Sequence, residues 1–300
     1  MNLVNKKILW ISDFDLTEAP GGAQRSDKIL IDKGKLLQAN IKNVTTKEIA
    51  GSNEYSNFLS SLENYDLVVS SNISYIYSLH PSIIQTLHNH KNHVRIEHDS
   101  NLYLTTEERH KLFGNCKKSF FLSQFHLDFF KEDYGLDLHT AEIIQDPIDP
   151  DVFKDKKEKR ENSILYSGYL HELKGADNFF NYVMSSPDVN FVVAGWPASN
   201  IYHLLCEKLS NISFLNHVDY ENMPEIYNRY SQLFYDPICK EPFCRTVAEA
   251  NMCGMQIITS EKGGARIGCL QEMDRLGREN FIESCRSASE RFWQKVSEVL

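Results

Sequence analysis

The sequence predicts an α/β protein of two domains, each built around a parallel sheet, and three observations support this prediction. Short apolar, β-branched runs recur along the chain, as in strands of a sheet that is covered on both faces. Longer segments with helical periodicity lie between these runs, which is the order expected of crossover helices. The length of 300 residues suits about two domains of ordinary size.

The expected strands divide into two sets, one in each half of the chain. In the first half they are Ile8–Ser12, Leu67–Ser70, Val94–Glu97 and Ser119–Leu122, and in the second half Ile164–Tyr166, Phe191–Ala194, Leu233–Tyr235 and Gln256–Thr259. The expected helices are Gly22–Leu37, Thr106–Phe113, Gln124–Asp133, Ala176–Met184, Pro197–Leu209, Pro224–Tyr230 and Arg245–Cys253. This alternation predicts two α/β domains in series.

A turn-rich stretch and a block of charges separate the two halves. Residues 145–151 read Gln-Asp-Pro-Ile-Asp-Pro-Asp, and residues 154–160 read KDKKEKR without an apolar period. We interpret the block as a solvated connection, with a phosphate or membrane contact as the less favoured alternative. The expected domains span 1–150 and 151–285, and a C-terminal helix over 286–300 is expected to pack back toward the N-terminal domain.

Composition narrows the partners and the compartment. The net charge of −9 argues against a broad basic surface for nucleic acid. The apolar run near the N-terminus is too short for a signal peptide or a membrane span, so we expect a cytoplasmic protein without stable membrane insertion. The seven cysteines form no Cys-x-x-Cys pair, and we expect them to be reduced.

Ligands of open α/β sheets bind in the loops after the carboxyl ends of strands, and two such loops of the first half carry chemical groups. Gly21 and Gly22 lead directly into a helix, where backbone amides attract an anion, although a simple turn is the alternative. His98 follows a strand beside two carboxylates. It can bond a sugar hydroxyl, exchange protons near neutral pH or merely cap the strand.

In the second half, Gly168, Tyr169 and Lys174 belong to a loop between a strand and a helix. A lysine at a helix N-terminus opposes the helix dipole, so its position is easier to understand if an anion such as a diphosphate lies between them. The alternative is a solvated lysine whose small energetic penalty is tolerated.

The strongest pattern is Glu241-Pro-Phe-Cys-Arg-Thr-Val-Ala-Glu249. Pro242 disfavours helical geometry at Glu241 and suits the first turn of the following helix, which leaves Glu249 inside that helix. A helix of this length spans about 12 Å, so the two carboxylates are placed to touch two parts of one elongated ligand. Two solvated glutamates are the alternative. After the next strand, Gly263 and Gly264 predict a turn that presents backbone amides.

This pattern resembles the retaining GT-B glycosyltransferases of the large family four-like group that includes sucrose and mannosyl transferases. The signature of that group is Glu, seven residues, Glu, and Glu241 and Glu249 fit its spacing. The similarity continues in family order over nearly the whole chain, at Gly21-Gly22, His98, residues 145–153, residues 168–175 and Gly263-Gly264. The resemblance implies two Rossmann-like domains that face each other across a cleft, with the acceptor side over 1–150 and the donor side over 151–285.

The same resemblance implies transfer of a hexosyl or pentosyl group from a nucleotide-sugar donor to an acceptor hydroxyl, with retention of the anomeric configuration and without a metal or other cofactor. It assigns Glu249 to the ribose and Glu241 to the donor sugar. His98 would contact that sugar from the first domain. The departing diphosphate would be neutralised by Lys174, with help from amides at Gly21, Gly22, Gly263 and Gly264.

The sequence also departs from the family pattern. Tyr169 stands where the family has an arginine on the diphosphate, and the candidates to replace that charge are Arg245, Arg25 and Arg266. Cys244 stands where glycine is common. The Asp13-Phe-Asp15 pair, which lies in the first domain, is not expected to bind a metal.

Two other functions stay open for the same fold. One is a nucleotide-sugar 2-epimerase or phosphorylase, and the other is a non-catalytic nucleotide-sugar-binding protein. The acceptor is open among a saccharide, a small molecule and a modified nucleic-acid base. The sequence does not determine the donor base, the donor sugar or the oligomeric state.

Overall fold

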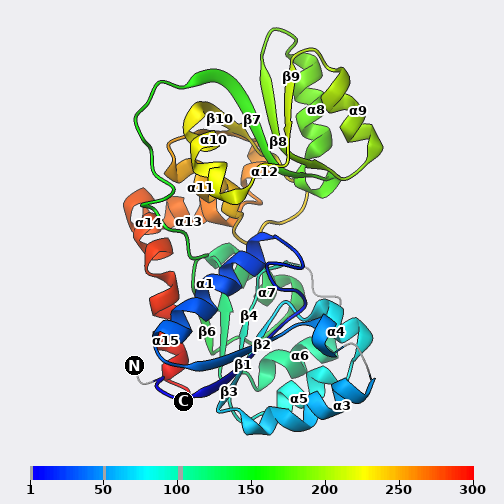
Figure 1. Ribbon diagram of the computed structural model, residues 1–300, viewed down its shortest axis with the longest axis vertical. Coiled ribbons are helices and arrows are strands. Elements are labelled where there is room, and N and C mark those ends of the chain that lie inside the picture. The colour runs from blue at the N-terminus through cyan, green and yellow to red at the C-terminus, as the bar shows by residue number, and fades with distance from the viewer. Residues whose placement is uncertain (1–2, 50–51, 101–103) are drawn as a thin grey trace. The chain divides into compact units, whose positions relative to one another are not determined.

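A computed structural model describes residues 3–49, 52–100 and 104–300 (Figure 1). The chain forms two compact units. The N-terminal unit consists of Met1–Pro147 and Glu283–Leu300, and the C-terminal unit is Ile148–Ile282. Each unit has a parallel sheet of its own with helices on its faces.

The N-terminal unit contains a six-stranded parallel sheet in the order β2-β1-β3-β4-β5-β6. The strands are β1 (Lys7–Ser12), β2 (Asn40–Val44), β3 (Leu67–Ser71), β4 (His93–Ile96), β5 (Lys118–Phe121) and β6 (Ala141–Ile143). The direction in which the chain adds strands to the sheet reverses between β1 and β3, because β2 lies on one side of β1 and β3 to β6 lie on the other. Such a reversal is where open α/β sheets usually bind ligands, at the carboxyl ends of the strands.

Helices cover both faces of this sheet. They are α1 (Gly22–Leu36), α2 (Thr46–Ile49), α3 (Ser52–Ser61), α4 (Ser74–Leu79), α5 (Ile83–Asn89), α6 (Thr106–Gly114), α7 (Gln124–Tyr134) and α15 (Ala288–Ser297). One hydrophobic core joins the sheet to α1 and α15, and a second core joins it to α3 through α7. The sheet is therefore buried on both faces, as its apolar strands predict.

Helix α15 packs beside α1, although the whole C-terminal unit separates them in the sequence (Figure 1). The ring of Trp293 lies 6.4 Å from that of Trp10, and its Nε1 donates to the Leu30 carbonyl at 2.7 Å. A Cβ on Gly34 would lie 2.4 Å from the Trp293 ring, so the glycine makes room for the indole. The core of the N-terminal unit thus includes a late segment of the chain.

The C-terminal unit contains a five-stranded parallel sheet in the order β11-β10-β7-β8-β9, and the chain direction reverses between β7 and β10. The strands are β7 (Glu161–Leu170), β8 (Phe191–Pro197), β9 (Ile212–Asn216), β10 (Tyr230–Phe234) and β11 (Gln256–Ile258). The helices are α8 (Ala176–Ser185), α9 (Asn200–Lys208), α10 (Met223–Arg229), α11 (Arg245–Met252), α12 (Glu261–Gly264) and α13 (Gly268–Leu276), and α14 (Arg278–Arg286) leads into the N-terminal unit. Two short 3-10 helices lie in loops after strands: η2 (Glu172–Lys174) follows β7, and η3 (Tyr220–Asn222) follows β9.

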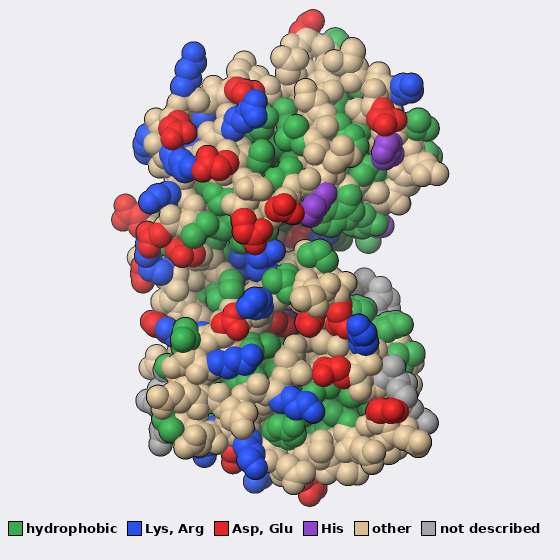
Figure 2. All heavy atoms as spheres, in the orientation of Figure 1, with side chains coloured by type: hydrophobic (Ala, Val, Ile, Leu, Met, Phe, Trp, Pro, Cys, Tyr) green, Lys and Arg blue, Asp and Glu red, His purple; other side chains and the backbone are tan. Residues whose placement is uncertain are grey.

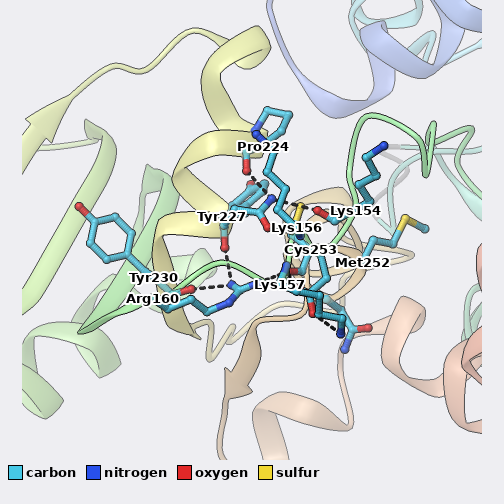
Figure 3. Close-up of polar contacts among 12 residues, drawn as sticks. Lys154, Lys156, Lys157, Arg160, Pro224, Tyr227, Tyr230, Met252 and Cys253 are labelled. Atoms are coloured by element: carbon cyan, nitrogen blue, oxygen red, sulfur yellow. Dashed lines mark hydrogen bonds and ion pairs between the residues drawn. The ribbon is translucent and has the colours of Figure 1, made fainter.

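Most residues of the charged block 154–160 are exposed, as expected of a solvated connection, and Arg160 anchors its end to the C-terminal unit (Figure 3). The guanidinium of Arg160 donates to the carbonyls of Tyr227 and Tyr230 at 2.8 and 2.9 Å and also to the carbonyl of Cys253. These carbonyls lie at the C-terminal ends of α10 and α11, where helices lack intrahelical donors and attract cations. Arg160 therefore caps the C-terminal ends of α10 and α11.

The seven cysteines are all free thiols, as expected from their spacing. Among residues 3–49, 52–100 and 104–300, no helix has the length and apolar character needed to cross a bilayer.

Candidate active site

The carboxyl ends of β7 and β10 bring Lys174 and Glu241 together. Lys174 ends η2, in the loop after β7, and Glu241 follows β10, where it forms a parallel bridge with Ile267. The Lys174 Nζ lies 2.6 Å from Glu241 Oε1, and the Tyr235 hydroxyl donates to the same oxygen at 2.8 Å. Because β7 and β10 flank the reversal of the sheet, this ion pair lies where the fold favours a ligand.

Lys174 is a fixed cation of this site. The side chain of Glu241 is 8% exposed, whereas that of Lys174 is 40% exposed. Burial acts to lower the pKa of Lys174, but the neighbouring Glu241 carboxylate outweighs it, and the pKa lies above its ordinary value. At neutral pH the ammonium is therefore protonated, and part of its side chain faces solvent.

The loop that carries Lys174 depends on the glycine after it. Lys174 is the last residue of η2, and Gly175 begins α8 as its N-cap. Gly175 has a φ of +83°, and a Cβ at this position would lie 2.0 Å from the carbonyl oxygen of Asp236. Glycine is therefore needed both for the conformation and for the close passage beside the end of β10.

Asp236, which the sequence analysis missed, ties the loop after β10 to its neighbours. Its Oδ1 accepts the amide and the hydroxyl of Ser260 at 2.9 and 2.6 Å, and its Oδ2 accepts the amide group of Asn178 at 2.9 Å. A Cβ on Gly263 would lie 1.8 Å from Oδ1. A carboxylate directly after an expected strand, Leu233–Tyr235, is the signal that could have identified it.

Gly263 and Gly264 lie in the short helix α12 and not in an open turn. The Gly263 amide donates to Ser260 Oγ at 3.0 Å, and the Gly264 amide donates to the Ser260 carbonyl at 2.8 Å. The expectation of a turn that presents these two amides is wrong, because Ser260 caps a helix here. A role of the two glycines in donor binding stays a prediction.

Glu249 and Arg245 form a buried pair on α11, one helical turn apart. Arg245 Nη2 lies 3.0 Å from Glu249 Oε1, and the Tyr220 hydroxyl donates to the same oxygen at 2.7 Å. The arginine thereby compensates the carboxylate in a place where an uncompensated charge would be costly. Tyr220 belongs to η3, after β9, so this network joins α11 to the loop that follows β9.

The arginines proposed to replace the missing charge at Tyr169 differ in their surroundings. Arg245 is paired with Glu249, and Arg266 donates from Nη1 to the Pro237 carbonyl at 3.3 Å. Arg25 lies in the other unit, on α1. Lys174 is paired as well, with Glu241, but its side chain is 40% exposed, whereas that of Arg245 is 8% exposed.

Helix α11 begins at Arg245, so Pro242 lies before the helix and not in its first turn. Cys244 is the N-cap and has a φ of +72° and a ψ of 82°. That conformation favours glycine, which gives a physical reason for the glycine common at this position. Burial raises the pKa of the Cys244 thiol, so the residue is a neutral side chain at this strained position.

Gly168 and Gly195 pair across β7 and β8 where the two strands approach closely. A Cβ on Gly195 would lie 1.8 Å from the Gly168 carbonyl oxygen, whereas a Cβ on Gly168 would meet nothing within 4 Å. There is therefore space beside the Cα of Gly168. Tyr169, the next residue, is 42% exposed.

His98 is buried in the N-terminal unit between two carboxylates. Its Nε2 lies 3.1 Å from Asp27 Oδ1, and its Nδ1 lies 3.9 Å from Asp146 Oδ1. Burial acts to lower the pKa of His98, but the hydrogen bond with Asp27 and the nearby carboxylates outweigh it and raise the pKa. The imidazole ring lies between α1 and the segment after β6, and a contact with a donor sugar stays a prediction.

Replacing His98 with glutamine is expected to destabilise the chain by about 1 to 3 kcal/mol near pH 6, because it removes a charged partner of Asp27. A raised pKa contributes stability that is fully present below the unfolded value of about 6.5 and is lost as pH rises through the folded pKa. Urea unfolding of both proteins between about pH 6 and pH 9.5 measures the difference, which should shrink with rising pH. A difference that grows with pH would contradict this account.

The glycine pair after β1 uses its two amides differently. Gly21 is the N-cap of α1, and its amide donates to the Ala19 carbonyl at 2.7 Å. Gly22 is the first residue of α1, where helical amides have no intrahelical acceptor. The start of α1 also carries no acidic residue in its first turn, so Gly22 keeps the geometry of an anion-binding helix start.

The two carboxylates of the Asp13-Phe-Asp15 pair accept hydrogen bonds from backbone amides. Asp13 accepts the amides of Tyr75 and Ile76 at 2.8 Å each, and burial raises its pKa to about 6. Asp15 accepts the Thr17 amide at 2.8 Å. Within the part of the chain that the structure describes, no group of three or more His, Cys, Asp or Glu side chains is arranged to hold a metal ion.

Residues 148–267 match the family model described as Glycosyl transferases group 1. This chain carries a glycosyltransferase domain. The domain lies within the C-terminal unit and contains Lys174, Glu241 and Glu249. The prediction of a glycosyltransferase enzyme is thereby confirmed. No curated protein matches the chain in sequence.

Several solved structures share the fold of nearly the whole chain. Anabaena HepE in complex with UDP and glucose has a TM-score of 0.66 at 15% identity, covering 98% of this chain and 97% of that one. Sucrose-phosphate synthase from Thermosynechococcus elongatus has a TM-score of 0.66 at 12% identity, covering 98% and 95%. A glycosyltransferase from Rickettsia africae has a TM-score of 0.65 at 15% identity, covering 98% and 94%. The predicted α/β class with two Rossmann-like domains, the GT-B fold, is confirmed.

Proposed function

We propose that the chain is a retaining, family four-like glycosyltransferase that transfers a hexosyl or pentosyl group from a nucleotide sugar to an acceptor hydroxyl. The observation that carries this proposal is the Lys174–Glu241 ion pair at the ends of β7 and β10, with Glu249 on the neighbouring α11. The fold shared with HepE, whose structure was solved in complex with UDP and glucose, supports a donor of this class.

Lys174 supplies the positive charge that donor cleavage requires. As the bond between the sugar and the diphosphate breaks, negative charge grows on the leaving phosphate oxygen, and a fixed ammonium stabilises it most in the transition state. Glu241 holds that ammonium in place through its 2.6 Å contact and accepts hydrogen bonds from the sugar hydroxyls. No metal cofactor is part of this proposal, because the protein's own cation fills that role.

Attack by the acceptor completes the transfer. The acceptor hydroxyl approaches the anomeric carbon from the face that the diphosphate leaves, and its proton passes to the departing phosphate oxygen. The new bond therefore forms with the original anomeric configuration. The acceptor is a saccharide, a small molecule or a modified nucleic-acid base, and the seven free thiols suit a reducing compartment such as the cytoplasm.

Glu249 is proposed to accept hydrogen bonds from the ribose hydroxyls. Tyr220 and Arg245 both bond its Oε1, which fixes the orientation of the carboxylate on α11. A buried, ionised acceptor of fixed orientation forms stronger hydrogen bonds with hydroxyl groups than a solvated one.

Replacing Glu249 with glutamine is expected to weaken donor binding about 10- to 100-fold, because hydrogen bonds to a charged acceptor become bonds to a neutral one. Calorimetric titration with UDP-, GDP-, ADP- and CMP-sugars measures the change and also identifies the base. Glu279→Gln, an exposed change on α14, is the matched control and should bind like the wild type. Equal donor affinity in Glu249→Gln and wild type would remove Glu249 from the donor site.

A non-catalytic nucleotide-sugar-binding protein is the second candidate, favoured by the uncharged Tyr169 at the expected arginine position. A donor-hydrolysis and transfer assay on the same donor separates the candidates. Release of nucleotide that depends on an acceptor supports the transferase, and Glu249-dependent binding without any turnover supports the binding protein. Conversion of the donor to its 2-epimer, or cleavage that requires inorganic phosphate, would instead indicate an epimerase or phosphorylase.

A further inference from the structure

Four aromatic side chains form a row along the carboxyl edge of the C-terminal sheet. Tyr169 lies near the end of β7, Trp196 near the end of β8, and His217 directly after β9, while His171 follows β7. The Tyr169 ring centroid lies 5.6 Å from that of His171 and 6.0 Å from that of Trp196, and Trp196 lies 5.3 Å from His217. These four residues are the aromatic row.

The aromatic row is open to solvent. Tyr169 and Trp196 are each 42% exposed, and the His217 side chain is 56% exposed. Figure 2 shows hydrophobic and histidine side chains exposed together on the β8–β9 side of the C-terminal unit. Rings of this size usually bury most of their surface, so a continuous exposed row at the ligand-binding edge of a sheet indicates a ligand.

The row extends away from the Lys174–Glu241 ion pair. In the sheet order, β10 lies on one side of β7, and β8 and β9 lie on the other. Neighbouring strands are about 4.8 Å apart, so the row reaches about 10 Å from β7 toward β9. Lys174 and Glu241 are therefore at one end of the edge, and Trp196 and His217 are toward the other.

The Glu249 network connects these two ends. Tyr220, whose hydroxyl bonds Glu249 Oε1 at 2.7 Å, belongs to the same loop as His217, after β9. A nucleotide sugar carries its base on the side of the ribose that is opposite the diphosphate and sugar. With the diphosphate at Lys174 and the ribose at Glu249, as the proposed function has it, the base is directed toward the loop after β9 and the aromatic row.

We propose that Trp196, flanked by Tyr169 and His217, stacks on the nucleobase of the donor. The base is the flat aromatic group of such a donor, and stacking on exposed aromatic side chains is an established way to hold bases. Stacking then supplies part of the affinity that an arginine at position 169 would supply through the diphosphate. This inference rests on the proposed function and makes Trp196 an affinity-determining residue of the donor site.

Tryptophan fluorescence tests this proposal directly. Of the three tryptophans, Trp10 and Trp293 are fully buried in the N-terminal unit, and Trp196 is exposed. UDP, GDP or ADP should quench the Trp196 emission in a saturable way, and inorganic pyrophosphate should not. Trp196→Phe should lose the quenching but keep nucleotide affinity within about threefold, because it keeps a ring.

Trp196→Ala should lower nucleotide affinity about tenfold, which is the effect expected of one lost base stack, and leave pyrophosphate affinity unchanged. Met184→Ala removes an exposed apolar side chain from α8 and is the matched control, with wild-type affinity and quenching expected. Circular dichroism checks that each variant is folded. If the alanine variant does not fold, quenching in the wild type and its loss in Trp196→Phe still decide the question.

The outcomes separate this inference from the proposed function. Nucleotide binding that depends on Glu249 but leaves both the Trp196 emission and the affinity of Trp196→Ala unchanged would overturn the stacking and leave the donor site in place. Failure of the wild type to bind any nucleotide or nucleotide sugar in calorimetry would overturn the proposed function, and the stacking with it.

Discussion

Replacing Lys174 with alanine is expected to lower kcat by about two to three orders of magnitude, with a change in donor KM of less than about tenfold. The ammonium acts on charge that develops only as the donor bond breaks, so its loss affects the transition state more than the bound ground state. Steady-state rates of transfer, or of donor hydrolysis before an acceptor is known, measure this effect. A variant with wild-type kcat would remove Lys174 from the reaction.

The Lys174 experiment needs two controls because the lysine also stabilises the fold. Its loss leaves the buried Glu241 carboxylate without the cation that lies 2.6 Å away, which is destabilising in itself. Thermal unfolding of the alanine variant separates that effect from catalysis. Lys174→Arg keeps the charge and should retain more activity than Lys174→Ala, while an equal loss in both would point to positioning of Glu241 instead of charge on the diphosphate.

Alanine at Gly195 is expected to destabilise the C-terminal unit by about 3 kcal/mol or more. The new Cβ would lie 1.8 Å from the Gly168 carbonyl oxygen. That oxygen belongs to the backbone of the neighbouring strand and cannot rotate away, so β7 and β8 have to separate at the edge that carries Tyr169 and Trp196. Urea unfolding measures the loss of stability, and nucleotide titration should show weaker binding by the remaining folded protein.

Gly114→Ala is the matched control for this experiment. Gly114 is the last residue of α6, and a Cβ there would meet nothing within 4 Å. Alanine at a helical position without a clash is neutral or stabilising by up to about 1 kcal/mol. Equal unfolding midpoints for Gly195→Ala and Gly114→Ala would mean that the strands can part at little cost.

The central strands of both sheets and one edge strand, β11, could be predicted from the sequence, whereas the other edge strands could not. Strands β1, β3 and β7 are flanked on both sides by other strands and carry continuous apolar runs. The missed strands β2, β6 and β9 lie at sheet edges, and their sequences NIKNV, AEI and ISFLN alternate with polar residues or are very short. Edge strands bury less surface, so their sequences carry a weaker apolar signal.

The residue types of the candidate site could be predicted, but not their contacts. Lys174 and Glu241 are 67 residues apart, and they meet because β10 pairs with β7, an arrangement that no local pattern encodes. The helix at Gly263 and Gly264 was predictable in principle, because Ser260 followed by Glu261 is a typical helix start. The aromatic row was not, since its rings come from three strands and a strand order that the sequence does not state.

The packing of α15 on α1 has a consequence for synthesis of the chain on the ribosome. Residues 288–297 are translated after the whole C-terminal unit, yet Phe292 and Trp293 fill the core around Trp10. One apolar face of the N-terminal sheet therefore stays uncovered until these residues have been made and have left the ribosome. Domains usually fold in the order of their translation, but here the N-terminal core has to wait for the last segment, which leaves a nascent apolar surface for chaperones to cover.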